Sequence, residues 1–239
     1  MMVEAMQENR QQIRSKERVA NHGEVFTSER EVKAMCDLVK PETERIDSRF
    51  LEPACGDGNF LVEVLSRKLA VVWRHYRRSA YDYERMSLLA LGSLYGVDIL
   101  EDNAASCRER LYGIWNEQYV RACASECNDE TRRSARFILS RNIVCGNALT
   151  LCCVDRNQRD THVPIIFSEW SFPRHDAMMR RKDYTFAQLL EEQLPSSGQT
   201  GKQMELTLDM DCEDQQDSQD GSRFIRQYIT HYRRIADEL

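Results

Sequence analysis

The sequence predicts an α/β fold in which a mostly parallel β-sheet is flanked by helices. Short apolar runs alternate with segments of helical periodicity across residues 23–154, the pattern of consecutive β–α units. An apolar run that ends at Glu52 passes through two glycines directly into an amphipathic helix pattern. With 239 residues, the chain is long enough for one such domain and little more.

The first expected element is a helix that begins near Ser28. Ser28 is a favourable N-cap residue, and Glu31 follows three residues later, as in a capping box. The apolar residues that follow have helical spacing and form one stripe: Val32, Met35, Cys36 and Val39. Thr27 and Ser28 can therefore serve as a helix cap alone, or also contribute to a site formed with the glycine loop.

The most informative segment is residues 50–61, which read Phe-Leu-Glu-Pro-Ala-Cys-Gly-Asp-Gly-Asn-Phe-Leu. Gly56 and Gly58 lack a Cβ atom, so the backbone there can turn sharply and approach a ligand. Backbone N–H groups at the start of the next helix are free to bind a charged group. Leu61 stands where a dinucleotide-binding G-x-G-x-x-G loop has its third glycine. A small-molecule site is predicted, while a structural turn and another nucleotide ligand stay open.

This segment resembles motif I of the S-adenosyl-L-methionine (SAM) dependent DNA adenine-N6 methyltransferases, as in the modification subunits of restriction systems. That motif reads D/E-P-x-C-G-x-G-x-F-L, and residues 52–61 meet each of its fixed positions. The resemblance implies a Rossmann-like SAM-dependent methyltransferase fold, complete or incomplete, with SAM as the cofactor. It implies that the loop residues contacting SAM are Glu52, Ala54, Gly56, Gly58, Asn59 and Phe60.

Two further segments resemble elements of the same family. Residues 23–28 resemble a G-x-x-[FY]-T-P element, with serine in place of the proline, which implies that Phe26 and Thr27 lie at the methionine end of SAM. Residues 142–149 resemble N-I-x-x-G-D-A-L, whose aspartate accepts a hydrogen bond from the adenine amino group. Asn147 stands in the place of that aspartate and is followed by Ala148. Because a carboxylate is the stronger acceptor, Asn147→Asp is expected to tighten SAM binding.

A second strand is expected at residues 94–97, and it ends in Asp98. A carboxylate at a strand end can accept hydrogen bonds from two ribose hydroxyls. The resemblance implies that Asp98, followed by Ile99, holds the ribose, with an extra helix inserted before this strand. The usual spacing of about 20 residues after the glycines favours Asp82 or Glu84 instead, although no strand precedes them.

The catalytic tetrapeptide of the family, [DNS]-P-P-[YFW], is absent from the sequence. Its polar side chain and first proline carbonyl hold the target amine, and its aromatic residue stacks on the flipped base. The chain has five prolines, and no two are adjacent. The apolar run at residues 163–167 lies where a fourth strand is expected, but residues 168–173 do not match the tetrapeptide. We therefore assign no catalytic residue from the sequence.

Charge and cysteine content limit the partners and the kinds of site. The 33 Lys and Arg against 39 Asp and Glu give a net charge of -6, whereas DNA-binding modules are usually basic. Contact with DNA is therefore expected through a partner chain, such as a restriction or specificity subunit. No apolar run approaches a membrane span and no signal-peptide pattern is present, so a cytoplasmic location without membrane contact is expected. The nine cysteines lack zinc-site spacing, which favours reduced thiols and no metal site.

Composition divides the chain into four expected parts. Residues 1–22 are a polar arm or helix, and residues 23–194 form the SAM-binding, methyltransferase-like domain. Residues 195–222 are rich in Ser, Gln and Asp and are expected to be a disordered acidic linker. Residues 223–239 are expected to form a C-terminal helix, because their apolar residues have helical spacing.

Two functions of different kinds stay open. The first is a SAM-dependent, site-specific DNA adenine-N6 methyltransferase of restriction–modification type that is active only with a partner. The second is a catalytically inactive SAM-binding subunit, or a truncated relic, with a regulatory or scaffold role. The missing tetrapeptide favours the second function for the isolated chain, whereas the other matching segments favour the first. An NAD-binding oxidoreductase is a weaker third, because the third glycine is absent.

Overall fold

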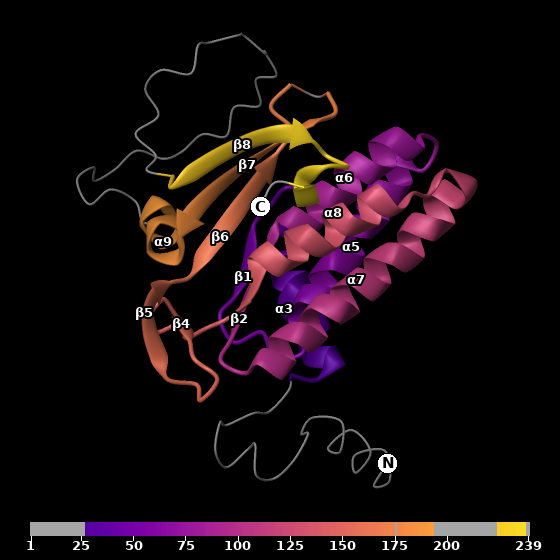
Figure 1. Ribbon diagram of the computed structural model, residues 1–239. Helices are drawn as coiled ribbons and strands as arrows, with labels where there is room; N and C mark the ends of the chain where they lie inside the picture. Colours follow the sequence, from indigo (N-terminus) through magenta and orange to yellow (C-terminus); the bar gives the residue numbers. More distant parts are fainter. Residues whose placement is uncertain (1–26, 175, 194–223, 238–239) are drawn as a thin grey trace, which may run out of the picture.

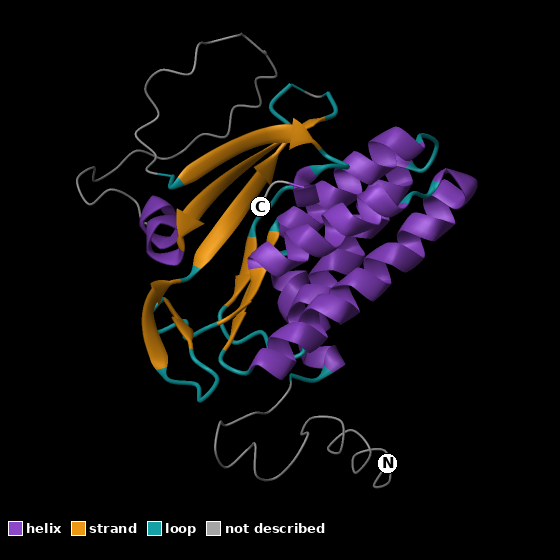
Figure 2. Ribbon diagram, viewed as in Figure 1, coloured by secondary structure: helices purple, strands orange, loops and turns teal. Residues whose placement is uncertain are grey.

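The computed structural model describes residues 27–174, 176–193 and 224–237. The expectations for residues 1–22, for Phe26 and for residues 195–222 lie outside this described part. Within it, the long helices gather on one side of the molecule and the strands on the other (Figure 1; Figure 2). None of the described helices has the length and apolar character needed to cross a membrane.

A parallel sheet of three short strands lies at the centre of the fold, in the order β1–β2–β3. Its strands are β1 (Phe50–Glu52), β2 (Leu94–Asp98) and β3 (Ile143–Cys145). Every residue of β2 is buried, as is typical of a central parallel strand covered on both faces. The predicted α/β class, with a parallel sheet flanked by helices, is confirmed for the described residues.

Four long helices form the layer on one face of this sheet. They are α5 (Asn59–Tyr76), α6 (Ala80–Gly92), α7 (Glu101–Cys123) and α8 (Asp129–Asn142), with the short 3-10 helix η1 (Ala124–Glu126) after α7. Their buried residues make up most of the larger apolar core, in which Trp115 stacks on Tyr119. Both α5 and α6 lie between β1 and β2, which confirms the inserted helix and explains why Asp98 is so far from the glycine loop in sequence.

Helix α3 (Glu29–Leu38) begins with the predicted capping box. The Glu31 N–H donates to the Ser28 hydroxyl at 3.4 Å, and the Ser28 N–H donates to the Glu31 carboxylate at 3.2 Å. Only Val32 and Cys36 of the expected apolar stripe are buried, and α3 packs on α5. The short helix α4 (Lys40–Thr43) then leads toward β1.

The other strands are antiparallel, so the prediction of a mostly parallel arrangement is wrong for the second half of the fold. Strands β4 (Cys152–Val154) and β5 (Asp160–Pro164) form a hairpin, and β6 (Ile166–Ser171), β7 (Met178–Thr185) and β8 (Arg226–His231) form a separate sheet. The apolar run at residues 163–167 therefore does not add a fourth parallel strand. Between β5 and β6, the Ile165 N–H donates to the Leu151 carbonyl at 2.9 Å, which holds the chain beside the hairpin.

The C-terminal helix expected within residues 223–239 is also wrong for the described part of that segment. Strand β8 pairs antiparallel with β7, and only the short 3-10 helix η2 (Ile235–Asp237) follows. The Cζ atom of the Arg181 guanidinium lies 4.7 Å from the centroid of the Tyr228 ring. Aromatic and β-branched residues such as Tyr228, Ile229 and Thr230 fit a strand well, and pairing with β7 decides between the two structures.

A smaller apolar cluster covers the face of the parallel sheet opposite the helices. Tyr95 and Val97 of β2 alternate with Leu94, which packs in the helical core, so the two groups point to opposite faces. The cluster also contains Ile165 and Phe167, together with Phe186 from helix α9 (Phe186–Gln193). The parallel sheet is thus held from both sides, and its carboxyl edge is left for a site.

Candidate functional site

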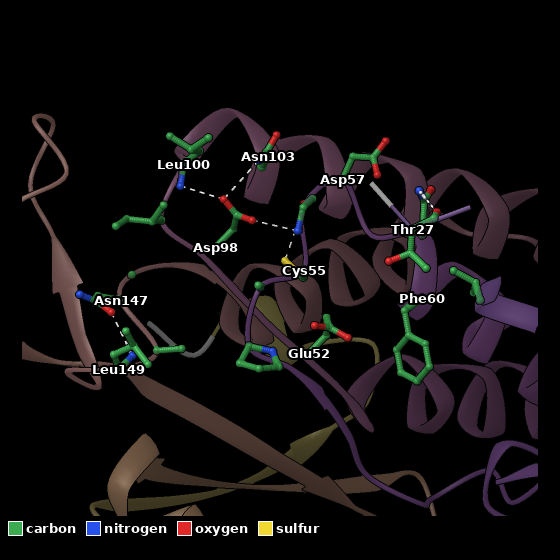
Figure 3. Close-up of a pocket in the computed structure, with 18 of the residues that line it drawn as sticks. Thr27, Glu52, Cys55, Asp57, Phe60, Asp98, Leu100, Asn103, Asn147 and Leu149 are labelled. Carbon is green, nitrogen blue, oxygen red and sulfur yellow. Dashed lines mark hydrogen bonds between the residues drawn. The ribbon is translucent and has the colours of Figure 1, made fainter. Parts of the chain in front are cut away.

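A cavity of about 450 Å³ opens at the carboxyl edge of the parallel sheet (Figure 3). The predicted site residues that line it are Thr27, Glu52, Ala54, Gly56, Asn59, Phe60, Asp98, Ile99, Asn147 and Ala148. They come from the last residues of β1 and β2, from the segments that follow β1, β2 and β3 up to the start of α5, and from the chain just before α3. Gly58 is not among the lining residues. The fold therefore brings together positions that are far apart in the sequence.

The glycine loop between β1 and α5 adopts a backbone that requires its glycines. Gly56 and Gly58 have φ values of +52° and +91°, in the left-handed region that disfavours other residues. A Cβ atom on Gly58 would lie 2.6 Å from the Cys107 Sγ of α7. Gly58 thus allows the loop to sit tightly on α7 and does not line the cavity, and its contact with SAM stays a prediction.

Asp98 ties the glycine loop to the turn after β2. Its Oδ2 accepts a hydrogen bond from the Gly56 N–H at 2.9 Å, and its Oδ1 accepts from the Leu100 N–H at 2.9 Å and from the Asn103 amide at 3.3 Å. Asp98 is buried, with 8% of the residue exposed. Asp98 therefore lies where the sequence predicts, and it has a second role that the sequence does not reveal, because it positions the loop itself.

Glu52 is a half-buried acid that lines the cavity. Burial raises the pKa of its carboxyl above the ordinary value, and a hydrogen bond with the backbone of Ala54 opposes that shift. A buried carboxylate gains most from a cationic partner. Glu52 is thus suited to a ligand that carries an ammonium group.

Asn59 and Arg110 brace the rim of the cavity. Arg110 of α7 donates to the Asp57 carbonyl at 2.8 Å and to Asn59 Oδ1 at 2.9 Å, and it pairs with the Asp57 carboxylate. The Asn59 amide in turn donates to the Thr27 carbonyl at 3.3 Å. The position of Thr27 beside the loop is therefore held by hydrogen bonds, although its own side chain is exposed.

Several cavity residues have no counterpart in the sequence prediction: Val32, Met35, Pro53, Cys55, Asp57, Leu100, Asn103, Gly146 and Leu149. Met35 belongs to the apolar stripe that the sequence predicts, but it is 47% exposed and supplies apolar surface to the cavity. Leu149 is 94% exposed, which is unusual for a leucine. Asn103 could have been found from its place at the start of the helix that follows Asp98.

The alternative acids and the segment in place of the tetrapeptide lie elsewhere. Asp82 and Glu84 are on α6 and do not line the cavity, so the alternative that one of them occupies the place of Asp98 is wrong. Ser168 is fully buried in β6, where its hydroxyl donates to Asp183 at 2.6 Å. Trp170 is buried against Gly92. Residues of β6 are thus used for packing.

The described residues contain no group of three or more His, Cys, Asp or Glu side chains arranged to hold a metal ion. The cysteines of the described ranges are free thiols. Comparison of the chain with protein-family models, with curated proteins and with solved structures finds no match. The geometry of the cavity is therefore the basis on which a function can be proposed.

Proposed function

We propose that the cavity binds SAM and that the chain is the cofactor-binding part of a DNA adenine-N6 methylation system of restriction–modification type, active together with a partner chain. One observation carries the proposal: the segments that resemble the family's cofactor elements converge on one cavity. That cavity lies outside the carboxyl ends of parallel strands, where open α/β sheets bind ligands. A structural turn alone would not require Thr27, Asp98 and Asn147 to meet there.

The chemistry of the lining residues fits SAM. Glu52 suits the ammonium group of the methionine part, and the Cβ-free Gly56 lets the loop backbone come close to it. Asp98 offers a carboxylate acceptor to ribose hydroxyls. Exposed apolar surface from Met35 and Leu149 suits the faces of an adenine ring. SAM would supply a methyl group made electrophilic by the sulfonium sulfur.

The residues of this chain account for cofactor binding and not for the target amine. An adenine N6 amine is a poor nucleophile until a polar acceptor and a stacking aromatic residue hold it in place. The described segment after the third parallel strand forms an antiparallel hairpin and sheet, and its Ser168 and Trp170 are buried. A partner chain is therefore proposed to hold the flipped base and to contact the DNA phosphates, which the net charge of -6 does not favour.

A second candidate function is a SAM-binding subunit without catalytic activity, which regulates or scaffolds another protein. The same burial of Ser168 and Trp170 favours it, because neither side chain can hold a substrate in this arrangement. The two candidates agree on cofactor binding. They differ only in whether methyl transfer occurs when the partner is present.

The deciding experiment incubates the purified chain with tritiated SAM and duplex DNA of mixed sequence, with and without the product of the adjacent gene. We expect no methyl transfer by the chain alone and transfer when the partner is added. Asp98→Ala should abolish transfer by the mixture, which would place the cofactor in this chain. Transfer by the chain alone would contradict the partner requirement. SAM binding without transfer in the mixture would favour the second candidate.

A further inference from the structure

Two neighbours of opposite hydrogen-bonding character hold the side-chain amide of Asn147. The Leu149 N–H donates to its Oδ1 at 2.9 Å, and its Nδ2 donates to Oδ1 of Asp160 at 2.9 Å. A backbone N–H can only donate and an ionised carboxylate can only accept, so both contacts select the same orientation of the amide. Figure 3 shows the nitrogen end of Asn147 turned away from Asp98 and its oxygen directed toward Leu149.

Asp160 reaches Asn147 from the β4–β5 hairpin. It is the first residue of β5 and stands opposite Val154 of β4. The same carboxylate oxygen also accepts from the Thr150 hydroxyl at 3.0 Å. The Asn147 N–H donates to the Cys152 carbonyl at 2.9 Å, so the hairpin is joined to Asn147 by its backbone as well. Asp160 does not line the cavity itself, and any effect on a ligand must pass through Asn147.

We propose that Asp160 is a positioning residue that makes the cavity selective for a 6-aminopurine, the adenine of SAM. This inference rests on the proposed function. An asparagine amide can present its carbonyl oxygen, which accepts from a 6-amino group, or its nitrogen, which donates to a 6-oxo group. Asp160 binds the nitrogen end, and the carbonyl oxygen, which accepts from the Leu149 N–H with one lone pair, keeps its second lone pair for a donor in the cavity. A carboxylate outside the adenine-binding segment thereby gives Asn147 the acceptor character that an aspartate would have.

The contact reverses the effect expected for Asn147→Asp from the sequence. That substitution would place a second carboxylate next to Asp160, where the amide nitrogen now lies 2.9 Å away. Two carboxylates at such a distance repel each other, and one of them must take up a proton or move. We therefore expect Asn147→Asp alone to weaken ligand binding. The double variant Asn147→Asp/Asp160→Asn should restore it, because an amide then faces the new carboxylate.

The test is calorimetry with two probes, S-adenosyl-L-homocysteine and its 6-oxo analogue S-inosyl-L-homocysteine. We expect the wild-type chain to prefer the adenosyl probe by about ten-fold or more, as for a hydrogen bond exchanged for a repulsive contact. Asp160→Ala, which removes the acceptor of the Asn147 Nδ2 group, should lower this preference about three- to ten-fold, mainly by weakening the adenosyl probe. A merely structural role for Asp160 would weaken both probes equally.

Two controls keep the outcomes distinct. Arg156→Gln changes the charge of the same hairpin without a contact to Asn147 and should leave the preference unchanged. In an Asn147→Ala background, Asp160→Ala should have no further effect on the preference. An unchanged preference in Asp160→Ala, or no restoration in the double exchange, would overturn the role of Asp160 while leaving SAM binding in place. Failure of the wild-type chain to bind either probe would overturn both this role and the proposed function.

Discussion

Gly58→Ala is expected to lower the free energy of unfolding by about 2–4 kcal/mol. A non-glycine residue at φ +91° costs about 1–2 kcal/mol. The new Cβ atom would lie 2.6 Å from the Cys107 Sγ, and Cys107 is fully buried, so the contact adds an overpacking cost of about 1–3 kcal/mol. Urea denaturation measures the change as a shift of the midpoint at constant slope.

Gly113→Ala is the matched control for Gly58→Ala. Gly113 lies within α7, and a Cβ atom there would meet nothing within 4 Å, so alanine should stabilise the protein by about 0.5–1 kcal/mol. Adding Cys107→Ala to Gly58→Ala should recover the contact part of the loss but not the backbone part. If Gly58→Ala were as stable as the wild-type protein, the tight seating of the glycine loop on α7 would be incorrect.

Glu84→Gln is expected to destabilise the protein by about 3 kcal/mol. The fully buried Glu84 carboxylate accepts from the Tyr119 hydroxyl at 2.5 Å and the Asn128 amide at 2.8 Å through one oxygen. Its other oxygen accepts from the Tyr232 hydroxyl at 2.6 Å and twice from Arg233. A glutamine must turn its NH₂ group toward one of these sets of donors, which leaves a buried donor without an acceptor.

The loss of stability in Glu84→Gln should first affect the C-terminal segment. Tyr232 and Arg233 follow β8 directly, so hydrogen exchange should speed up in β8 before the helices are affected. The Arg233 side chain is 35% exposed, so solvent weakens its ion pair, and Arg233→Gln should cost less than Glu84→Gln. Arg234→Gln, at a side chain that is 72% exposed, is the control and should change stability by less than about 0.5 kcal/mol. Equal effects at both arginines would contradict the role of the Glu84 network.

Local patterns in the sequence predict the parts of the site that depend on local backbone structure. The capping box of Ser28 and Glu31 needs only residues three apart, and the glycine loop needs only a strand, a turn and a helix in succession. The position of Asp98 at a strand end follows from the same short-range reading. These features are present in the structure at the expected residues.

Contacts between distant segments are the parts that the sequence does not predict. The helical spacing around Tyr228 is genuine, but pairing with β7 makes the segment a strand. Its spacing after the glycines favours Glu84 as a ribose ligand, whereas in the structure its carboxylate accepts hydrogen bonds from Tyr119 and Arg233. The contact of Asp160 with Asn147 joins two elements through a hairpin whose register no short pattern encodes.

The central claim, that the cavity at the carboxyl edge of the parallel sheet binds SAM, is tested most directly by titration calorimetry with S-adenosyl-L-homocysteine. We expect one-to-one binding that Asp98→Ala weakens by about 1.5–3 kcal/mol, as for a lost hydrogen bond to a charged group. Arg156→Gln should bind as the wild-type chain does, and thermal unfolding without ligand should show that both variants are folded. No binding by the folded wild-type chain at about 1 mM ligand would contradict the claim.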